Sequence, residues 1–376
     1  MIITCYTAGH APWDRRPLPL QPPPALTRRR LGAGALFASS AIVLRRAKAA
    51  RSVTLMAFGG WFQTYFDRII VEAFRKAHPD IGVFYYPVGN SFQMLGVLRE
   101  QRFLPSTDVV LLETGVAAKA TAEDLLGPLS PEAMPVLKDL IQQAAVPGVA
   151  GPALVLDSLA MGYNPAQVTQ APWSWRNLWD PAYGRRIALQ TPPDTAALAL
   201  TVVAGALFGG SDLQRSLSVG INALTQLAPR VVSWDPLPDI YTAIAVGDAG
   251  IGPGWNARAQ NQAALTPGRF AANIPDEGSP VRIITVNLVK GSPQPEAARI
   301  LLAWLLGPQA QRLLTETMFF APVNARADIA PASLARVGAT PAMAARRMAM
   351  DWVAVDGIRD QITAEWRRRK LAGHQS

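Results

Sequence analysis

The sequence predicts an α/β protein in which helices cover both faces of a largely parallel sheet. Two observations support this class. Nearly all-apolar stretches such as "SVTLMAF" and "TDVVLLETG" recur along the 376 residues, and stretches with apolar residues at helical spacing separate them. Strands that are apolar on both sides must be buried on both faces, so helices are expected above and below the sheet. The hydrophobic share of 49% suits one large or two modest domains with real cores.

The first part of the chain alternates strand and helix. The predicted strands are residues 52–58, 81–87 and 107–113, and the predicted helices are residues 61–78 and 91–101. The first helix must stop at Pro79, because proline cannot continue a helix. The third strand is expected to run into a polar loop.

The same alternation continues further along the chain. The predicted strands are residues 187–190, 230–234 and 281–289, and the predicted helices are residues 196–208, 239–246, one that begins at Asp212, and two that meet at Gly307-Pro308. At that junction the glycine is expected to end one helix and the proline to begin the next. The tail is expected to be helical.

The N-terminal stretch is typical of an export signal. "TRRRL" precedes a 13-residue apolar stretch, and "RRAKAA" then offers an Ala-x-Ala cleavage site at residues 47–49. A helix of that length rises about 20 Å, too little for a bilayer core of about 30 Å. Thr27, Arg28, Arg29 and Leu31 resemble a twin-arginine signal, and an ordinary secretory signal is the alternative. We expect cleavage after about Ala49 and a periplasmic mature chain.

Charge and cysteine content exclude several classes. The net charge is +9, but residues 1–49 hold eight of the 36 Lys and Arg residues and one of the 27 acids, so the remainder carries about +2. A near-neutral body has no electrostatic footprint for nucleic acid. The single cysteine, Cys5, lies in the leader. The mature chain is therefore expected to have no disulfide, no thiolate metal site and no cofactor.

Two long extended stretches, residues 151–165 and 281–289, suggest connections between two lobes. The first lobe would comprise residues 52–157 plus 286–376, and the second lobe residues 158–285. Two α/β lobes joined by two crossing strands form a cleft with a hinge.

Several motifs, in one order from about residue 53 to 329, carry a resemblance to a known family. They include "FRKAHPDIGV", "MGYNP", "PWSWRNLWDPAYGRRIAL", "VGDAGIGPGWNARA" and "KGSPQPEAARILLAWLLGPQAQ". In this order they resemble the extracellular solute-binding proteins of ABC importers, in the branch that binds polyamines, iron, thiamine or aminoethylphosphonate. "MDWVAVDGIRDQITAEW" is more similar to the polyamine binders than to the iron binders.

The resemblance implies a function as well as a fold. It implies a periplasmic-binding-protein type II architecture and capture of a small solute by hinge closure. It also implies delivery to a membrane permease and its ATPase, by a monomer without metal or cofactor. The best guess for the solute is a polyamine or another amine. An organic anion, a phosphonate or a zwitterion is the alternative, and so is a ligand-binding module of a sensor.

Candidate ligand-binding residues follow from the family's layout and from the rule that ligands lie beyond the carboxyl ends of parallel strands. They are Trp61, Phe62, Glu113, Thr114, Tyr163, Asp194, Trp234, Asp235, Trp255 and Thr285. Trp255 matches a wall of the polyamine site. Asp194 suits a helix N-cap as well as an amine partner. Thr285 stands where polyamine binders carry an aspartate, which weakens the polyamine assignment and makes a singly charged amine or a zwitterion plausible.

Trp173, Trp175 and Trp179 are expected to be scaffold, because a tryptophan buries a large area and needs one partner for its N–H.

An exported enzyme is disfavoured, since only His78 and His374 follow the leader and no G-x-S-x-G motif is present. We therefore expect a binding protein and not an enzyme.

Overall fold

The structure, a computed structural model, describes residues 51–209, 213–348 and 350–369. The predicted leader, the start of a helix at Asp212 and the end of the tail lie outside these described residues.

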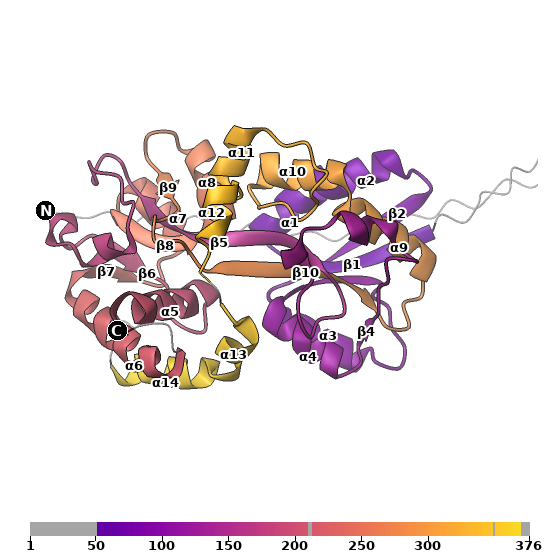
Figure 1. Ribbon diagram of the computed structural model, residues 1–376, viewed down its shortest axis with the longest axis horizontal. Coiled ribbons are helices and arrows are strands. Elements are labelled where there is room, and N and C mark those ends of the chain that lie inside the picture. The colour runs from indigo at the N-terminus through magenta and orange to yellow at the C-terminus, as the bar shows by residue number, and fades with distance from the viewer. Residues whose placement is uncertain (1–50, 210–212, 349, 370–376) are drawn as a thin grey trace, which may run out of the picture. The chain divides into compact units, whose positions relative to one another are not determined.

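A mixed sheet runs through the described chain (Figure 1). Its strands are β1 (Arg51–Phe58), β2 (Ile81–Val88), β3 (Val109–Glu113), β4 (Leu126–Gly127), β5 (Ala153–Tyr163), β6 (Ile187–Leu189), β7 (Val231–Trp234), β8 (Ile251–Trp255), β9 (Ala271–Asn273) and β10 (Val281–Val289). The order is β2-β1-β3-β10-β5-β8-β6-β7, with β4 beside β10 and β9 beside β5. Pairs among β1–β3 and among β6–β8 are parallel, and every pair of β5 or β10 is antiparallel.

The helices fill the connections between these strands. They are α1 (Trp61–Tyr65), α2 (Glu72–Ala77), α3 (Ser91–Glu100), α4 (Thr114–Ala122), α5 (Thr195–Gly209), α6 (Leu213–Leu227), α7 (Ile240–Val246), α8 (Asn256–Leu265), α9 (Pro295–Leu306), α10 (Pro308–Met318), α11 (Pro331–Arg336), α12 (Pro341–Ala345), α13 (Trp352–Gly357) and α14 (Arg359–Arg368). A π-helical turn, Phe66–Val71, joins α1 to α2, so the predicted first helix is continuous. Gly307 ends α9 and Pro308 begins α10, as predicted.

The first core covers both faces of β1–β3. Leu55 and Leu111 face one cluster, with Phe66, while their strand neighbours Met56 and Leu112 face a second cluster, with α3 and α4. This alternation follows from the two-residue period of a strand. It explains why these strands are apolar at every position, as predicted.

The second core covers both faces of β6 and β8 in the same way. Ile187 and Leu189 face α5 and α6, whereas Ala188 faces α7 and α8. The C-terminal helices also pack here, with Trp352 and Trp366 buried in the second core. We expected residues 286–376 to complete the first lobe, and the end of that stretch differs. The Trp366 ring is fully buried against α5 and its Nε1 donates to Thr201 Oγ1 at 3.0 Å.

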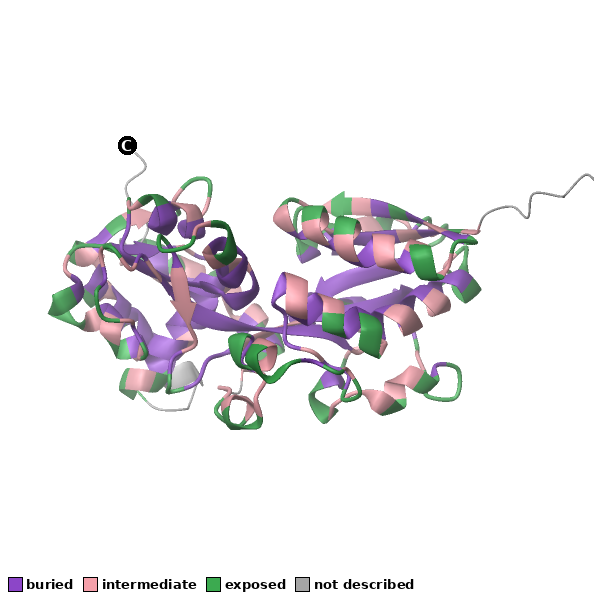
Figure 2. Ribbon diagram, turned by 90° about the horizontal axis from the view of Figure 1, so that it is seen from above, coloured by how far each residue is buried: buried purple, intermediate pink, exposed green. Residues whose placement is uncertain are grey.

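Strands β5 and β10 connect the two cores. Leu156 of β5 belongs to the first core and Leu159 to the second, so the strand passes between cores at Asp157 and Ser158. Both strands are buried along most of their length (Figure 2). Arg282 of β10 is the register partner of Asp157. A charged pair therefore lies at the crossing.

One local expectation was wrong. The polar residues after β3 do not form a loop, because α4 begins at Thr114, directly after the strand. The strand-to-helix junction at Glu113 and Thr114 thus has a fixed geometry, which matters for the site below.

The tryptophans predicted as scaffold mostly are scaffold. Trp175 is fully buried and its Nε1 donates to the Gly278 carbonyl at 2.8 Å. Trp179 Nε1 donates to the Ala223 carbonyl at 2.9 Å. Trp173 differs, since it is 54% exposed. Among the described helices, none combines the length and apolar character that a bilayer crossing needs.

Candidate functional site

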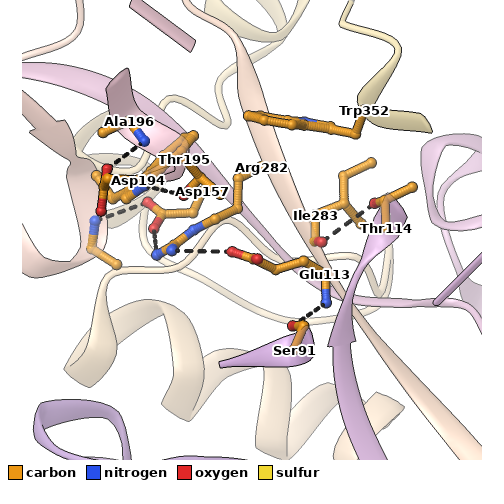
Figure 3. Close-up of polar contacts among 12 residues, drawn as sticks. Ser91, Glu113, Thr114, Asp157, Asp194, Thr195, Ala196, Arg282, Ile283 and Trp352 are labelled. Carbon is orange, nitrogen blue, oxygen red and sulfur yellow. Dashed lines mark hydrogen bonds and ion pairs between the residues drawn. The ribbon is translucent and has the colours of Figure 1, made fainter. Parts of the chain in front are cut away.

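A cluster of charged side chains surrounds Arg282 at the crossing of β5 and β10 (Figure 3). Arg282 Nη2 lies 2.8 Å from Asp157 Oδ2, and its Nη1 lies 3.7 Å from Glu113 Oε1. Its guanidinium carbon lies 4.6 Å from the centroid of the Trp255 ring. One cation is thus held by two carboxylates and an aromatic face.

The Asp157 side chain is completely buried and satisfied on both sides. Besides the ion pair, it accepts a hydrogen bond from the Ala257 N–H at 2.9 Å, at the start of α8. A buried carboxylate needs such partners, since an unpaired charge in a protein interior is costly. Asp157 therefore fixes Arg282 and the helix α8 at once.

Tryptophan rings form one wall of the site. Trp255 Nε1 donates to Thr195 Oγ1 at 3.2 Å, and its ring centroid lies 6.1 Å from that of Trp352. Trp352 Nε1 donates to the Val281 carbonyl at 2.7 Å, which ties the tail to the crossing strand β10. Both rings are anchored through their N–H groups, so their faces stay fixed.

Two carboxylates stand at helix starts beside the cation. The Glu113 carboxylate side chain precedes α4, and the Glu113 N–H donates to Ser91 Oγ at 3.1 Å. Asp194 precedes α5, and its Oδ1 accepts from the Ala196 N–H at 2.7 Å. This confirms Asp194 as an N-cap, whose helix-stabilising effect is about 1 kcal/mol.

Burial sets the protonation of this cluster. It raises the pKa of Glu113 above its ordinary value; Arg282 and Arg359 oppose this shift, while Asp356 and Asp194 add to it. Burial also raises the pKa of Asp194. Burial alone would lower the pKa of Arg282, but Asp157 and Glu113 outweigh it and raise that pKa. The Arg282 guanidinium remains charged, and keeping the buried carboxylates ionised costs free energy.

A small pocket opens beside the cluster. It has about 250 Å³ of atom-free space, part of it open to solvent. Its lining residues are Glu113, Thr114, Gly115, Thr195, Arg282, Ile283, Trp352, Asp356 and Arg359. Its enclosed part is only about 10 Å³, which is room for about one water, so a solute can enter only when the walls move apart. The residues that the structure describes contain no group of three or more His, Cys, Asp or Glu side chains that could hold a metal ion.

Four of the residues predicted from the sequence lie at this site. They are Glu113, Thr114, Asp194 and Trp255. Thr114 Oγ1 faces the Ile283 carbonyl of β10 at 3.4 Å. Trp61 lies at a neighbouring cluster, where its Nε1 donates to Asn261 Oδ1 at 2.9 Å and the Arg258 guanidinium lies 6.0 Å from its ring.

The other predicted residues lie apart from the pocket. Phe62 is buried in the first core, stacked on Phe66. Tyr163 and Trp234 pack against the second core, Trp234 edge-on to Trp366.

The side chains of Asp235 and Thr285 form hydrogen bonds with backbone groups. Asp235 Oδ1 accepts from the Thr191 N–H at 2.7 Å. Thr285 is fully buried, and its Oγ1 donates to the Leu112 carbonyl at 3.0 Å. The residues of β10 that line the pocket are Arg282 and Ile283, near the start of the strand, whereas Thr285 lies further along it, within the first core's sheet.

Several residues of the site were missed from the sequence. The sequence pointed to Asp157 and Arg282, because each is the only charged residue of a largely apolar strand and such a residue must find a partner. No local sequence pattern pointed to Trp352, Asp356 and Arg359, since only tertiary packing brings the tail to the pocket.

Known proteins resemble the chain in sequence and in structure. A family model described as "Bacterial extracellular solute-binding protein" matches residues 70–345. A "Putative 2-aminoethylphosphonate-binding periplasmic protein" of Salmonella typhi is 28% identical over 293 residues, which cover 75% of this chain and 79% of that protein. A "Gamma-aminobutyric acid-binding protein" of Pseudomonas aeruginosa is 26% identical over 196 residues, 48% of this chain and 52% of that protein.

Among solved structures, a spermidine/putrescine ABC transporter substrate-binding protein from Streptococcus pneumoniae matches with a TM-score of 0.71 at 17% identity. The match covers 85% of this chain and 99% of that one. The shared fold confirms the predicted α/β class of type II periplasmic binding proteins. The relatives are solute-binding transport proteins and not enzymes, as the sequence predicted. The chain therefore belongs to the bacterial extracellular solute-binding proteins, which bind small solutes for ABC importers.

Proposed function

We propose that this protein captures a small zwitterion with a primary amine and an acidic group, in the periplasm, for an ABC permease and its ATPase. The observation that carries the proposal is the mixed charge of the pocket. Arg282 and Arg359 line it together with Glu113 and Asp356. A ligand with one charge of each sign can satisfy both kinds of side chain, which a simple anion or cation cannot.

The expected pose places each ligand charge against its complement. The ammonium would lie near Glu113, with the ring of Trp352 as a cation-binding wall. Asp194 and Trp255 stand behind these lining residues, and Arg282 covers a face of the Trp255 ring. The acidic group would lie near Arg359, one of the two guanidinium groups that line the pocket. Aminoethylphosphonate and 4-aminobutyrate, named in the two relatives, both have an amine and an acid joined by a short chain.

A polyamine is the second candidate. The carboxylates Glu113, Asp157 and Asp194 lie around one central cation, Arg282, and this local excess favours a cationic ligand. Arg359 opposes it, because a second guanidinium at the pocket repels an all-cationic chain.

Capture is proposed to occur by closure of two lobes about β5 and β10. The lobes would follow the predicted boundaries, residues 52–157 with the stretch after 286, and residues 158–285. The exception is α13 and α14, which pack in the second core. A ligand that touches both lobes prefers the closed form and shifts the population toward it. The protein is proposed to act as a monomer after export and cleavage near Ala49.

The test is thermal unfolding against four matched probes and putrescine. The probes are 2-aminoethylphosphonate, 4-aminobutyrate, ethylphosphonate and ethanolamine. Free ligand at about one hundred times its Kd adds about 2.7 kcal/mol, an easily measured shift in Tm. The proposal expects shifts with the first two and little shift with ethylphosphonate or ethanolamine, each of which lacks one charge. A shift with putrescine alone would replace the zwitterion with a polyamine.

A further inference from the structure

The helix α13 is anchored in the second core. Trp352 and Val355 are buried there, and Trp352 also bonds to the crossing strand β10. The helix α4 is anchored in the first core through Val116 and Ala117. These two helices nevertheless touch each other beside the pocket, so a contact between them joins the two cores.

At this contact an ion pair between Asp356 of α13 and Arg359, the first residue of α14, lies against a glycine and a ring of the first core. Asp356 and Arg359 pair with each other, and their side chains are 6% and 13% exposed. Asp356 Oδ2 lies directly against Gly115, in the first turn of α4. The Arg359 guanidinium carbon lies 4.9 Å from the centroid of the Phe92 ring in α3, and its Nη1 donates to the Pro193 carbonyl at 2.6 Å.

Gly115 has no local reason to be glycine. It lies inside a helix, where alanine is favoured over glycine by about 1 kcal/mol. A Cβ built there would lie 1.7 Å from Asp356 Oδ2 and 2.6 Å from its Cγ. Asp356 is short and is held by Arg359, so it cannot simply swing away. The absence of a side chain at residue 115 therefore serves the contact with Asp356.

We propose that Asp356 and Arg359 form a latch across the pocket, and that Gly115 and Phe92 are its seat. When the two cores approach each other, the latch closes and places Arg359 and Asp356 at the pocket. The latch residues are positioning residues, because they bring a wall of the pocket into place. The ligand class in this inference rests on the proposed function, whereas the contact between the latch and its seat rests on the structure alone.

The test compares Gly115→Ala with Gly96→Ala. Gly96 lies inside α3, and a Cβ there would meet no atom within 4 Å, so it controls for helix propensity. Nitroxide labels at Lys76→Cys and Arg269→Cys, both exposed and on opposite cores, report the separation of the cores. The full chain carries Cys5→Ser to remove its single natural cysteine. Pulsed electron resonance gives the distance distribution without ligand and with 2-aminoethylphosphonate or 4-aminobutyrate.

The expected result has two parts. Gly115→Ala shifts the distribution toward longer distances and weakens probe binding at least tenfold, whereas Gly96→Ala behaves like the parent. Asp356→Ala removes the group that meets the new Cβ, so Gly115→Ala has no further effect in that background. This non-additivity is a signature that a general loss of stability would not produce, and Tm values identify any variant that fails to fold.

Two results would overturn the latch. One is a Gly115→Ala distribution equal to that of Gly96→Ala, both without ligand and with probe. The other is a Gly115→Ala effect that persists unchanged beside Asp356→Ala. If neither probe binds the parent protein, the proposed ligand class fails, and the ligand-free distributions still decide the latch.

Discussion

Two arginines stand on tryptophan rings near the junction of the cores, and their surroundings differ. Arg258 is fully engaged: its Nη2 bonds to Asp239 Oδ2 at 2.9 Å, its Nη1 bonds to Gln262 Oε1 at 3.1 Å, and it lies between Trp61 and Tyr241. Arg282 has one close partner, Asp157, and one distant partner, Glu113 at 3.7 Å, and its buried Nε has none.

The difference separates a structural cation from one that is poised for a ligand. Both Nη atoms of Arg258 have hydrogen-bond partners, and Arg258 does not line the pocket. Arg282 keeps unused donors and a loosely held carboxylate beside open space. A charge that is incompletely paired at a pocket is where a ligand gains the most.

The largest effect is expected from removing the two arginines. Arg282→Met leaves Asp157 buried and unpaired, so the free energy of unfolding should fall by about 3–5 kcal/mol. Arg258→Met leaves Asp239, which is 30% exposed, and should cost only about 1 kcal/mol. Urea unfolding measures both. Adding Asp157→Asn to Arg282→Met should restore much of the stability but not the binding of 2-aminoethylphosphonate. Equal losses of unfolding free energy in the two arginine variants would contradict the distinction between a structural cation and one that is poised for a ligand.

A smaller effect is expected from the loosely held carboxylate. Glu113→Gln removes the partner proposed for the ligand amine, and the Kd for 4-aminobutyrate should rise about tenfold, the equivalent of 1.4 kcal/mol. Glu296→Gln is the matched control, because that side chain is 79% exposed on α9. Calorimetric titration decides the case. An unchanged Kd in Glu113→Gln would move the amine elsewhere in the pocket.

The pH dependence should separate stability from binding. Because burial raises the folded-state pKa of Glu113, the folded chain binds this proton more tightly than the unfolded chain does. The stability deficit of the parent relative to Glu113→Gln should therefore be largest at neutral pH. It should shrink as pH falls through the raised pKa, and vanish below the unfolded value of about 4.3.

Ligand affinity should follow the opposite trend over the same pH range. A protonated Glu113 no longer attracts the ammonium, so the Kd of the parent should rise on acidification while that of Glu113→Gln changes less. Parallel pH profiles for the two proteins would contradict a role for Glu113.

The smallest effect is expected at the Arg258 cluster. Trp61→Phe removes the hydrogen bond to Asn261, whose net contribution should be about 1 kcal/mol of unfolding free energy. The Kd for the probes should change less than about threefold, which titration can measure. A large loss of affinity would show that Trp61 belongs to the ligand site, as its position after β1 first suggested.

Most of the fold could be predicted from the sequence because its signals are local. The apolar strands and the Gly307-Pro308 junction are each specified by neighbouring residues. The site was predictable where a residue ends a strand, as with Glu113 and Trp255, or stands at the start of a helix, as with Thr114 and Asp194. Thr285, which the sequence predicted at the site, lies outside the pocket, because the pocket borders the start of β10 at Arg282 and Ile283 and Thr285 is fully buried further along the strand. The tail's contribution depends on contacts more than 150 residues apart in the chain, such as Trp366 with Thr201.

The direct pairing of Arg282 with Asp157 has a consequence for how such a protein can evolve. The two residues are register partners on neighbouring strands, and each would be an unpaired charge without the other. A lineage that changes its solute by replacing Arg282 must pass through a destabilised intermediate unless Asp157 changes first or at the same time. We expect the two positions to covary among relatives, so that specificity shifts occur in coupled steps rather than by single substitutions.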